Sequence, residues 1–119
     1  MGGLGDGRAV AGVKAIHRGE IWLYTFKKPD KWRPVLVLSR PEVIPLLRTV
    51  LVAPITSSIR GVPSEVPVGL SEGLKHDSAV NLDHVQTVGK ADLHQFVGSL
   101  KPETMAAVCR ALAIATGGR

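Results

Sequence analysis

The stretch DKWRPVLVLSR, Asp30 to Arg40, places an arginine and a proline directly before an unbroken run of four apolar residues. Such a run predicts a strand that is covered on both faces, and we expect this strand over Pro34–Ser39. Pro34 is compatible with it, because the first residue of a strand does not need to donate a ladder hydrogen bond. Arg33 needs another explanation, since a buried strand usually opens with a turn residue.

Further strands are expected on both sides of this stretch. The segment GEIWLYTF, Gly19–Phe26, is rich in β-branched and aromatic residues. The segment Arg40–Arg48 contains two prolines and predicts a connection with room for one helical turn. Later segments predict a third strand, a short fourth strand broken by a proline, and an alternating stretch of one bent strand or two, at Thr49–Ile55, Ser64–Val68 and Ser78–Gly89.

One helix is expected near the end of the chain, after the segment Asp92–Leu100. It spans Pro102–Thr116, because proline suits the first helical position and Gly117 suits the stop. Leu100 and Met105 have the spacing of a hydrophobic staple around a cap at Lys101. The helical period predicts one apolar face made of Met105, Val108, Cys109, Leu112 and Thr116.

Short strands separated by frequent turn residues, followed by a terminal helix, favour a mainly β fold with α (α+β), in the form of a small antiparallel β-barrel. The strand–helix alternation of a parallel α/β fold is absent from the sequence. The 119 residues fit one domain. The glycine-rich residues 1–15 are expected to be a flexible leader, and residues 16–117 the folded domain.

Composition limits the possible partners. Fifteen lysines and arginines against ten acidic residues give a net charge of +5, which suits nucleic acid, an anionic membrane or an acidic polypeptide. The single cysteine, Cys109, excludes an internal disulfide and a four-cysteine zinc site, and the histidine spacings match no metal site. The apolar runs are too short for a membrane span and the start does not resemble a signal peptide, so we expect a cytoplasmic protein.

Five motifs, in order and spacing, resemble the MazF/PemK/Kid toxins of bacterial toxin–antitoxin systems, over about Ile16 to Thr116. They are RGEIW (18–22), RPVLVLS (33–39), VAPITSS (52–58), SEVPV (64–68) and SAVNLDHVQTV (78–88). The resemblance implies an SH3-like barrel with appended helices, which acts as a homodimer. It also implies a sequence-selective endoribonuclease that cleaves single-stranded RNA without a metal or other cofactor and leaves a 2′,3′-cyclic phosphate and a 5′-hydroxyl. An antitoxin with a disordered, acidic segment neutralises such toxins.

The resemblance also assigns the catalytic residues. The family's arginine before Pro-Val falls on Arg33, and its threonine after the third strand falls on Thr56. A guanidinium forks onto two phosphoryl oxygens and stays charged at every working pH. A threonine hydroxyl can donate to a phosphoryl oxygen. The two side chains can meet at one rim of the barrel if their strands are neighbours. Glu20 and Trp22, in the first motif, are expected to be structural.

Proton transfer has several candidate groups. Many relatives carry a GSEQGG-type loop with a glutamate before the arginine, whereas this chain has the shorter, basic FKKPDKW. The general base stays open between Asp30 and the four histidines, each of which also fits a structural role. These histidines are His17, His76, His84 and His94.

RNA contacts are expected from two loops. Lys27, Lys28 and Lys31 can neutralise phosphates, and Trp32 can either stack on an unpaired base or fold onto the barrel. The residues after Thr56 that can contact substrate are Ser57, Ser58 and Arg60. An alternative function is that of the CcdB gyrase poisons, which share this fold but bind a topoisomerase without catalysis. The ending ATGGR lacks their Trp-Gly-Ile type terminus.

Overall fold

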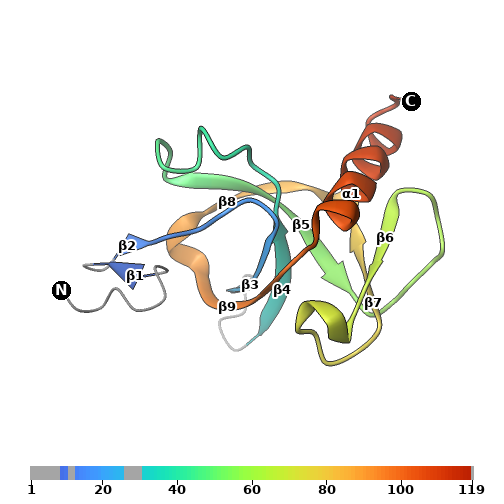
Figure 1. Cartoon of the computed structure of the whole chain (residues 1–119), viewed down its shortest axis with the longest axis horizontal. Helices are drawn as coiled ribbons and strands as arrows, with labels where there is room; N and C mark the ends of the chain where they lie inside the picture. The colour runs from blue at the N-terminus through green and yellow to red at the C-terminus, as the bar shows by residue number, and fades with distance from the viewer. Residues whose placement is uncertain (1–8, 11–12, 26–30, 119) are drawn as a thin grey trace.

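The computed structural model describes residues 9–10, 13–25 and 31–118, and within them an antiparallel sheet dominates (Figure 1). Its strand order is β6-β7-β5-β4-β3-β9, and β8 also pairs with β5. The seven strands are β3 (Glu20–Thr25), β4 (Trp32–Val37), β5 (Thr49–Thr56), β6 (Glu65–Val68), β7 (Ser78–Asn81), β8 (Gln86–Gly89) and β9 (Leu93–Ser99). The order ends at β6 and β9, so the predicted barrel forms as a curled sheet that does not close.

Shorter elements connect these strands. Two-residue strands, β1 (Ala9–Val10) and β2 (Val13–Lys14), pair with each other in the region predicted to be a leader. The 3₁₀ turns η1 (Leu70–Glu72), η2 (Leu82–His84) and η3 (Lys90–Asp92) lie between strands in the second half of the chain. The α-helix α1 (Pro102–Ala115) follows β9. No helix in the described ranges is both long and apolar enough to cross a membrane.

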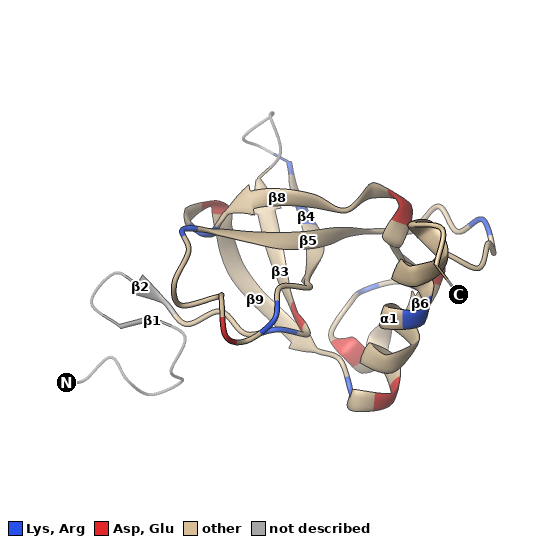
Figure 2. Cartoon of the chain, turned by 90° about the horizontal axis from the view of Figure 1, so that it is seen from above, with Lys and Arg blue, Asp and Glu red and all other residues tan. Residues whose placement is uncertain are grey.

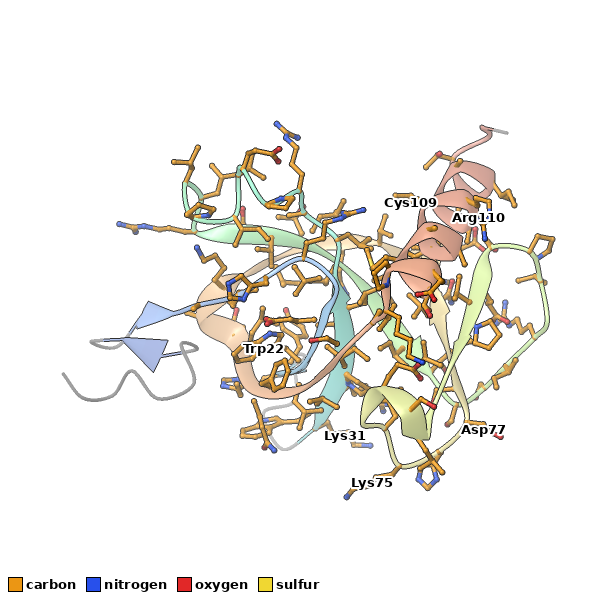
Figure 3. The ribbon with its side chains drawn as sticks, in the orientation of Figure 1. Trp22, Lys31, Lys75, Asp77, Cys109 and Arg110 are labelled. Atoms are coloured by element: carbon orange, nitrogen blue, oxygen red, sulfur yellow. The ribbon has the colours of Figure 1, made fainter. Side chains whose placement is uncertain are left out.

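The sheet separates two apolar cores. Side chains alternate along β4, so Leu36 and Leu38 enter one core while Val35 and Val37 enter the other. The first core lies under α1 and also contains Ile21, Ala53, Ile55, Val80 and Leu82. The second core lies inside the curl, where Trp22 packs edge-to-face on Phe96 with ring centroids 5.9 Å apart (Figure 3). Coverage of both faces of β4 is confirmed.

The helix has the predicted bounds to within one residue, but its buried face is rotated. Val108 and Ala111 are buried, whereas Cys109 and Thr116 are exposed, so the predicted face was wrong at these two positions. The small side chain of Ala111 lets the helix backbone approach the sheet closely. The spacing of the larger apolar residues does not predict that this alanine faces the core. Cys109 lies on the flank, where its Sγ accepts a hydrogen bond from Arg18 Nη2 at 3.2 Å.

Two strand predictions change in the structure, and a third, left open between one bent strand and two, is decided. β4 begins at Trp32, two residues before Pro34, because it pairs with β3 from Trp32↔Thr25 onward. Residues 93–99 form β9, which the sequence pattern did not indicate as a strand. The alternating segment 78–89 forms two strands, since η2 separates β7 from β8.

Candidate functional site

The ladder between β4 and β5 ends at a proline. Val37 O accepts a hydrogen bond from Gly19 N at 2.9 Å, whereas Leu38 N donates to Leu51 O at 2.8 Å. Because backbone groups alternate sides along a strand, odd-numbered residues of β4 face β3 and even-numbered residues face β5. Pro34 therefore directs its ring nitrogen toward β5 and leaves the pairing with β3 intact.

Beyond this proline the neighbouring strands β4 and β5 stop pairing. We call the gap in the ladder, with Arg33 on β4 and Thr56 on β5, the fork. The last pair between β4 and β5 is Val35↔Pro54. The next hydrogen-bonded pair would join Pro34 and Ile55, but Pro34 has no N–H to donate. On its opposite edge, β5 passes from pairing with β8 to pairing with β7 at Ile55, and Figure 1 shows this end of β5 turning away from β4. Pro54 is accommodated in the same way, since it falls between the ladder with β8 and the ladder with β7.

Arg33 lies on one side of the fork, with its backbone held in the ladder opposite Tyr24. Its side chain is exposed and has no hydrogen-bond or ion-pair partner within the described residues. The register of β4 and β5, continued two residues past Val35↔Pro54, sets Arg33 against Thr56. A fixed backbone with a free guanidinium suits anion binding, and this is a physical reason for an Arg-Pro pair within the strand.

Thr56 lies on the other side of the fork and is half-buried. It pairs with Ala79 of β7, and its Oγ1 accepts the backbone N–H of Ser58 at 3.0 Å. The hydroxyl proton stays available for donation to a ligand. The structure brings Thr56 and Arg33 to the same end of the sheet, and no hydrogen bond joins them in the described part of the chain.

The loop after Thr56 is fixed by Glu65, the first residue of β6. Its carboxylate accepts the backbone N–H groups of Arg60 at 3.0 Å and of Gly61 at 2.9 Å. Gly61 has a φ of 75°, a conformation that side-chain-bearing residues rarely adopt. Ser57, Ser58 and Arg60 are all exposed on this loop.

The start of β4 carries exposed cationic and aromatic side chains. Lys31 projects at the lower edge of Figure 3, and blue segments mark the start of β4 and the loop beyond β5 in Figure 2. Trp32 is 48% exposed, and its ring stacks on His94 of β9 with centroids 4.8 Å apart. Trp32 therefore packs on a neighbour yet keeps half of its surface open. Lys27, Lys28 and Asp30 lie outside the described residues.

The remaining histidines lie elsewhere. His17 Nδ1 lies 3.1 Å from Glu20 Oε2. The Glu20 carboxylate is buried and also accepts from His17 N and from Trp22 Nε1, both at 2.9 Å, so the structural roles predicted for Glu20 and Trp22 are confirmed. His76 and His84 are exposed outside the fork. No three His, Cys, Asp or Glu side chains in the described ranges are grouped to hold a metal ion.

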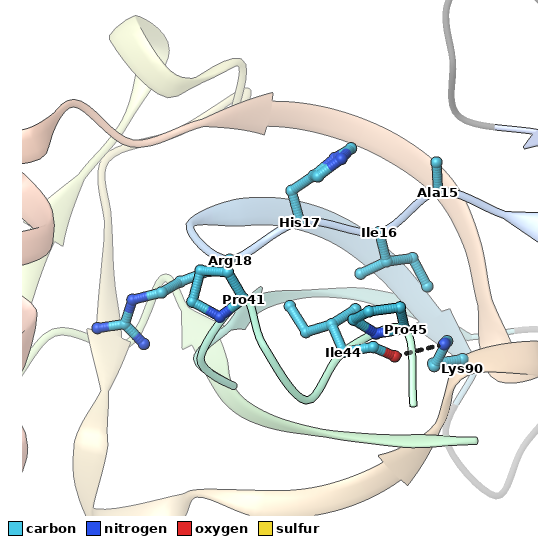
Figure 4. A pocket seen from close by; sticks show the side chains of 8 residues that line it. All are labelled: Ala15, Ile16, His17, Arg18, Pro41, Ile44, Pro45 and Lys90. Atoms are coloured by element: carbon cyan, nitrogen blue, oxygen red, sulfur yellow. Dashed lines mark hydrogen bonds between the residues drawn. The ribbon is translucent and has the colours of Figure 1, made fainter. Parts of the chain in front are cut away.

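A pocket at the far end of the second core is a weaker candidate (Figure 4). Its cations are already engaged, since Lys90 Nζ donates to Ile44 O at 2.7 Å and to Leu47 O at 2.9 Å, and Arg18 donates to Leu38 O. The walls are otherwise mainly apolar, from Ala15, Ile16, Pro41, Ile44 and Pro45. This arrangement closes the core and offers no free reactive group.

The sequence patterns did not predict that Glu65 and His94 belong to the region around the fork. Glu65 stands inside the SEVPV motif, but only the folded loop shows that it reaches back to Arg60 and Gly61. His94 was considered only as a base or a structural residue, because no sequence pattern joins it to Trp32.

Comparison with known proteins gives the same family by sequence and by structure. Residues 17–116 match the family model described as PemK-like, MazF-like toxin of type II toxin-antitoxin system. The "Probable endoribonuclease MazF5" of Mycobacterium tuberculosis (strain ATCC 25618 / H37Rv) is 46% identical over 99 residues, which cover 82% of this chain and 90% of that protein.

Two solved structures are similar over most of the chain. One is the "Mycobacterium tuberculosis toxin MazF-mt6", with a TM-score of 0.77 and 38% identity, covering 84% of this chain and 98% of the other. The second is an "Endoribonuclease in complex with its cognate antitoxin from Mycobacterial species", with a TM-score of 0.79 and 29% identity, covering 87% of this chain and 96% of the other.

Proposed function

This chain belongs to the PemK-like, MazF-like toxins of type II toxin–antitoxin systems, and from that membership we propose that it is a sequence-specific endoribonuclease that cleaves single-stranded RNA without a metal ion. The observation that carries the proposal is the fork between β4 and β5. There, Arg33 is exposed and has no side-chain partner among the described residues, and the continued register of β4 and β5 sets it against Thr56, whose hydroxyl proton is available.

The reaction that fits these groups is attack by the RNA's own 2′-hydroxyl. The 2′-oxygen loses its proton and bonds to phosphorus, the bond from phosphorus to the 5′-oxygen breaks, and that oxygen takes up a proton. The products are a 2′,3′-cyclic phosphate and a 5′-hydroxyl. Between them lies a five-coordinate phosphorane that carries more negative charge than the substrate, so the site must stabilise a dianion.

Arg33 supplies that stabilisation in our proposal. Its backbone is held opposite Tyr24 in a regular ladder, so the start of the side chain is fixed before RNA binds. The guanidinium then donates two parallel hydrogen bonds to the equatorial phosphoryl oxygens. A preorganised donor of this kind is worth about 3–4 kcal/mol of transition-state stabilisation.

Thr56 positions the phosphate from the opposite side of the fork. The Ser58 N–H occupies a lone pair of its Oγ1, and this orients the hydroxyl. Its proton donates to a phosphoryl oxygen and holds the scissile group in line for the attacking 2′-oxygen.

The surrounding residues bind the rest of the substrate in this proposal. Lys31 and Arg60 are exposed cations on the two sides of the fork, with Ser57 and Ser58 between Thr56 and Arg60. They neutralise backbone phosphates and offer hydroxyl contacts. Lys27 and Lys28 precede Lys31 and are assigned the same role from the sequence.

We also propose the partners of the family for this chain. A homodimer would place two forks on one assembly, and an acidic antitoxin segment would compete with RNA for a protein of net charge +5. A similar solved structure is titled as an endoribonuclease in complex with its cognate antitoxin. The expected place of action is the cytoplasm, where mRNA is present.

The proposal is tested by incubating the purified protein, free of antitoxin, with a long single-stranded RNA in EDTA and mapping the product ends. We expect discrete cuts with cyclic-phosphate and 5′-hydroxyl ends, and their loss in Arg33→Ala. The matched control is Arg48→Ala, which removes an exposed arginine before the opposite end of β5. A folded wild type that cuts no RNA, or equal cutting by Arg33→Ala, contradicts the proposal and would direct attention to a protein target such as a topoisomerase.

A further inference from the structure

The aromatic stack at the start of β4 joins residues from two strands that are not neighbours. Trp32 belongs to β4 and His94 to β9, and β3 lies between them in the sheet. Their rings are nearly parallel, with an interplanar angle of 11° and centroids 4.8 Å apart. Both residues are exposed, so the stack lies on the surface and is not part of either core.

A β-bulge lies at His94, the residue that stacks on Trp32. In the ladder between β3 and β9, Leu23 pairs with Gln95 and Tyr24 pairs with Leu93, which leaves His94 as the extra residue between two regular pairs. Leu93 remains fully buried in the second core. Bulges are common beside active sites, where they re-aim a side chain. Since Leu93 points into the second core, alternation sets His94 on the opposite face, the face that also carries Trp32, and the bulge locally bends the strand at this position.

Trp32 is adjacent to the residue assigned to the scissile phosphate. Consecutive residues of a strand point to opposite faces, so Trp32 and Arg33 lie on the two faces of β4 at the end of the sheet. The β5 side of β4 is unpaired there, because the ladder stops at Val35↔Pro54. A single strand of RNA that passes over this free edge can place a phosphate at Arg33 and a neighbouring base at Trp32.

We propose that Trp32 and His94 together form a stacking platform for one unpaired nucleobase of the RNA, next to the nucleotide that is cleaved. His94 covers one face of the indole and fixes its orientation, and the base stacks on the open part of the ring. Lys31 supplies a cation beside this base for the adjoining phosphate. His94 is thus a positioning residue, and the inference rests on the proposed endoribonuclease function.

The choice of a nucleobase follows from the geometry of the platform. A partly exposed indole held parallel to a second ring offers a flat π-surface, and every base has a π-face that can stack on it. Trp32 is flanked by Lys31, just before β4, and by Arg33 on β4, and these cations suit the phosphates on either side of such a base. An apolar peptide would gain less here, since a cationic residue stands on each side of Trp32 along the chain.

The test compares His94→Ala, His94→Phe and the control His84→Ala, which removes another exposed histidine, on η2. Affinity is measured by anisotropy with a labelled RNA that carries a 2′-O-methyl group at the mapped cut site, so that it binds without cleavage. We expect His94→Ala to weaken binding and raise KM by about three- to tenfold, with kcat unchanged. His94→Phe keeps a ring on the indole and should restore affinity, and His84→Ala should bind like the wild type.

Tryptophan emission gives a second readout. Trp22 is buried and Trp32 is half-exposed, so quenching of emission by bound RNA reports chiefly on Trp32. This quenching should be smaller in His94→Ala than in His94→Phe at saturating RNA.

The platform and the endoribonuclease function fail in different ways. A wild type that cleaves no RNA contradicts the function. A wild type that cleaves RNA, with unchanged affinity and KM in His94→Ala, overturns the platform alone. Equal losses in His94→Phe and His94→Ala also overturn it, because stacking would then not be the property that matters.

Discussion

The Glu65 carboxylate accepts the backbone N–H of Gly61 at 2.9 Å, and so ties the first residue of β6 to the loop that follows β5. The same carboxylate accepts the N–H of Arg60 at 3.0 Å. Since this loop begins immediately after Thr56, one acidic side chain fixes the chain on the exit side of the candidate catalytic threonine. The Glu65 carboxylate thus binds two backbone amides, and it makes no ion pair with any described side chain.

Glu65→Ala should therefore lower kcat/KM by about tenfold, because the exposed loop loses two hydrogen bonds to a charged group and holds Thr56 less firmly. A tenfold loss corresponds to about 1.4 kcal/mol, the lower end of what one such bond contributes. Glu65→Gln keeps one acceptor oxygen and should recover most of the activity. The measurement is steady-state cleavage of a fluorogenic RNA beside thermal unfolding. Equal activity in Glu65→Ala and the wild type would show that the loop does not position Thr56.

Thr56 can be tested by separating its hydroxyl from its volume. Thr56→Val keeps the shape but removes the proton that donates to phosphate, so kcat should fall by about 10²-fold, as for other single donors to a transition state. Thr56→Ser keeps the hydroxyl and should retain most of kcat. Single-turnover cleavage at saturating enzyme measures this step. If Thr56→Val cleaves as fast as Thr56→Ser, the hydroxyl has no catalytic role.

Pro34 can be tested by restoring an N–H to the strand. In Pro34→Ala the new amide faces Ile55 O, so the ladder between β4 and β5 can gain a hydrogen bond and the fork can narrow. We expect slow hydrogen exchange at the amide of position 34. We also expect kcat/KM to fall about fivefold, because a narrower fork misplaces the groups that hold the phosphate. Pro67→Ala, on the edge strand β6, is the control. Fast exchange at position 34 with full activity would contradict this explanation of the fork.

Glu20 should control stability and not chemistry. Its buried carboxylate accepts hydrogen bonds from the backbone and ring of His17 and from the Trp22 indole. Glu20→Ala leaves a buried indole N–H without its partner and should lower the free energy of unfolding by about 2–4 kcal/mol. Urea unfolding followed by Trp22 emission measures the change. The control is Glu103→Ala, which removes an exposed acid in the first turn of α1 and should change the free energy of unfolding by under about 1 kcal/mol. Similar losses of stability in both variants would show that the buried hydrogen bonds of Glu20 are not the cause.

Much of the fold could be predicted because it follows from local sequence patterns. The four apolar residues 35–38 need cover on both faces, and the structure places them between two cores. The helix begins at Pro102 and ends just before Gly117 as its capping residues predict. β9 was missed because its two bulges with β3 break the alternation that marks a strand.

The candidate site was predicted only in part. Arg33 and Thr56 came from the family motifs, and their catalytic roles stay predictions that the mutants above can test. The hydrogen bonds of Glu65 could not be predicted, because a carboxylate that binds backbone amides needs no oppositely charged residue at a recognisable spacing in the sequence. His94 is 62 positions from Trp32 by residue number, and only the pairing of β4 and β9 with the two sides of β3 brings the two rings together.

The sequence by itself determined the helix, the position at which a proline removes a backbone donor, the family that the chain resembles, and every main-sheet strand except β9. These are properties of single residues and of near neighbours, set by side-chain burial, backbone angles and the missing N–H of proline. Only the tertiary structure decided that the missing donor of Pro34 faces β5, that the other edge of β5 passes from β8 to β7, and that Arg33 and Thr56 flank the resulting fork. These relationships depend on strand register, which is fixed by how distant segments pack together and not by any one of them.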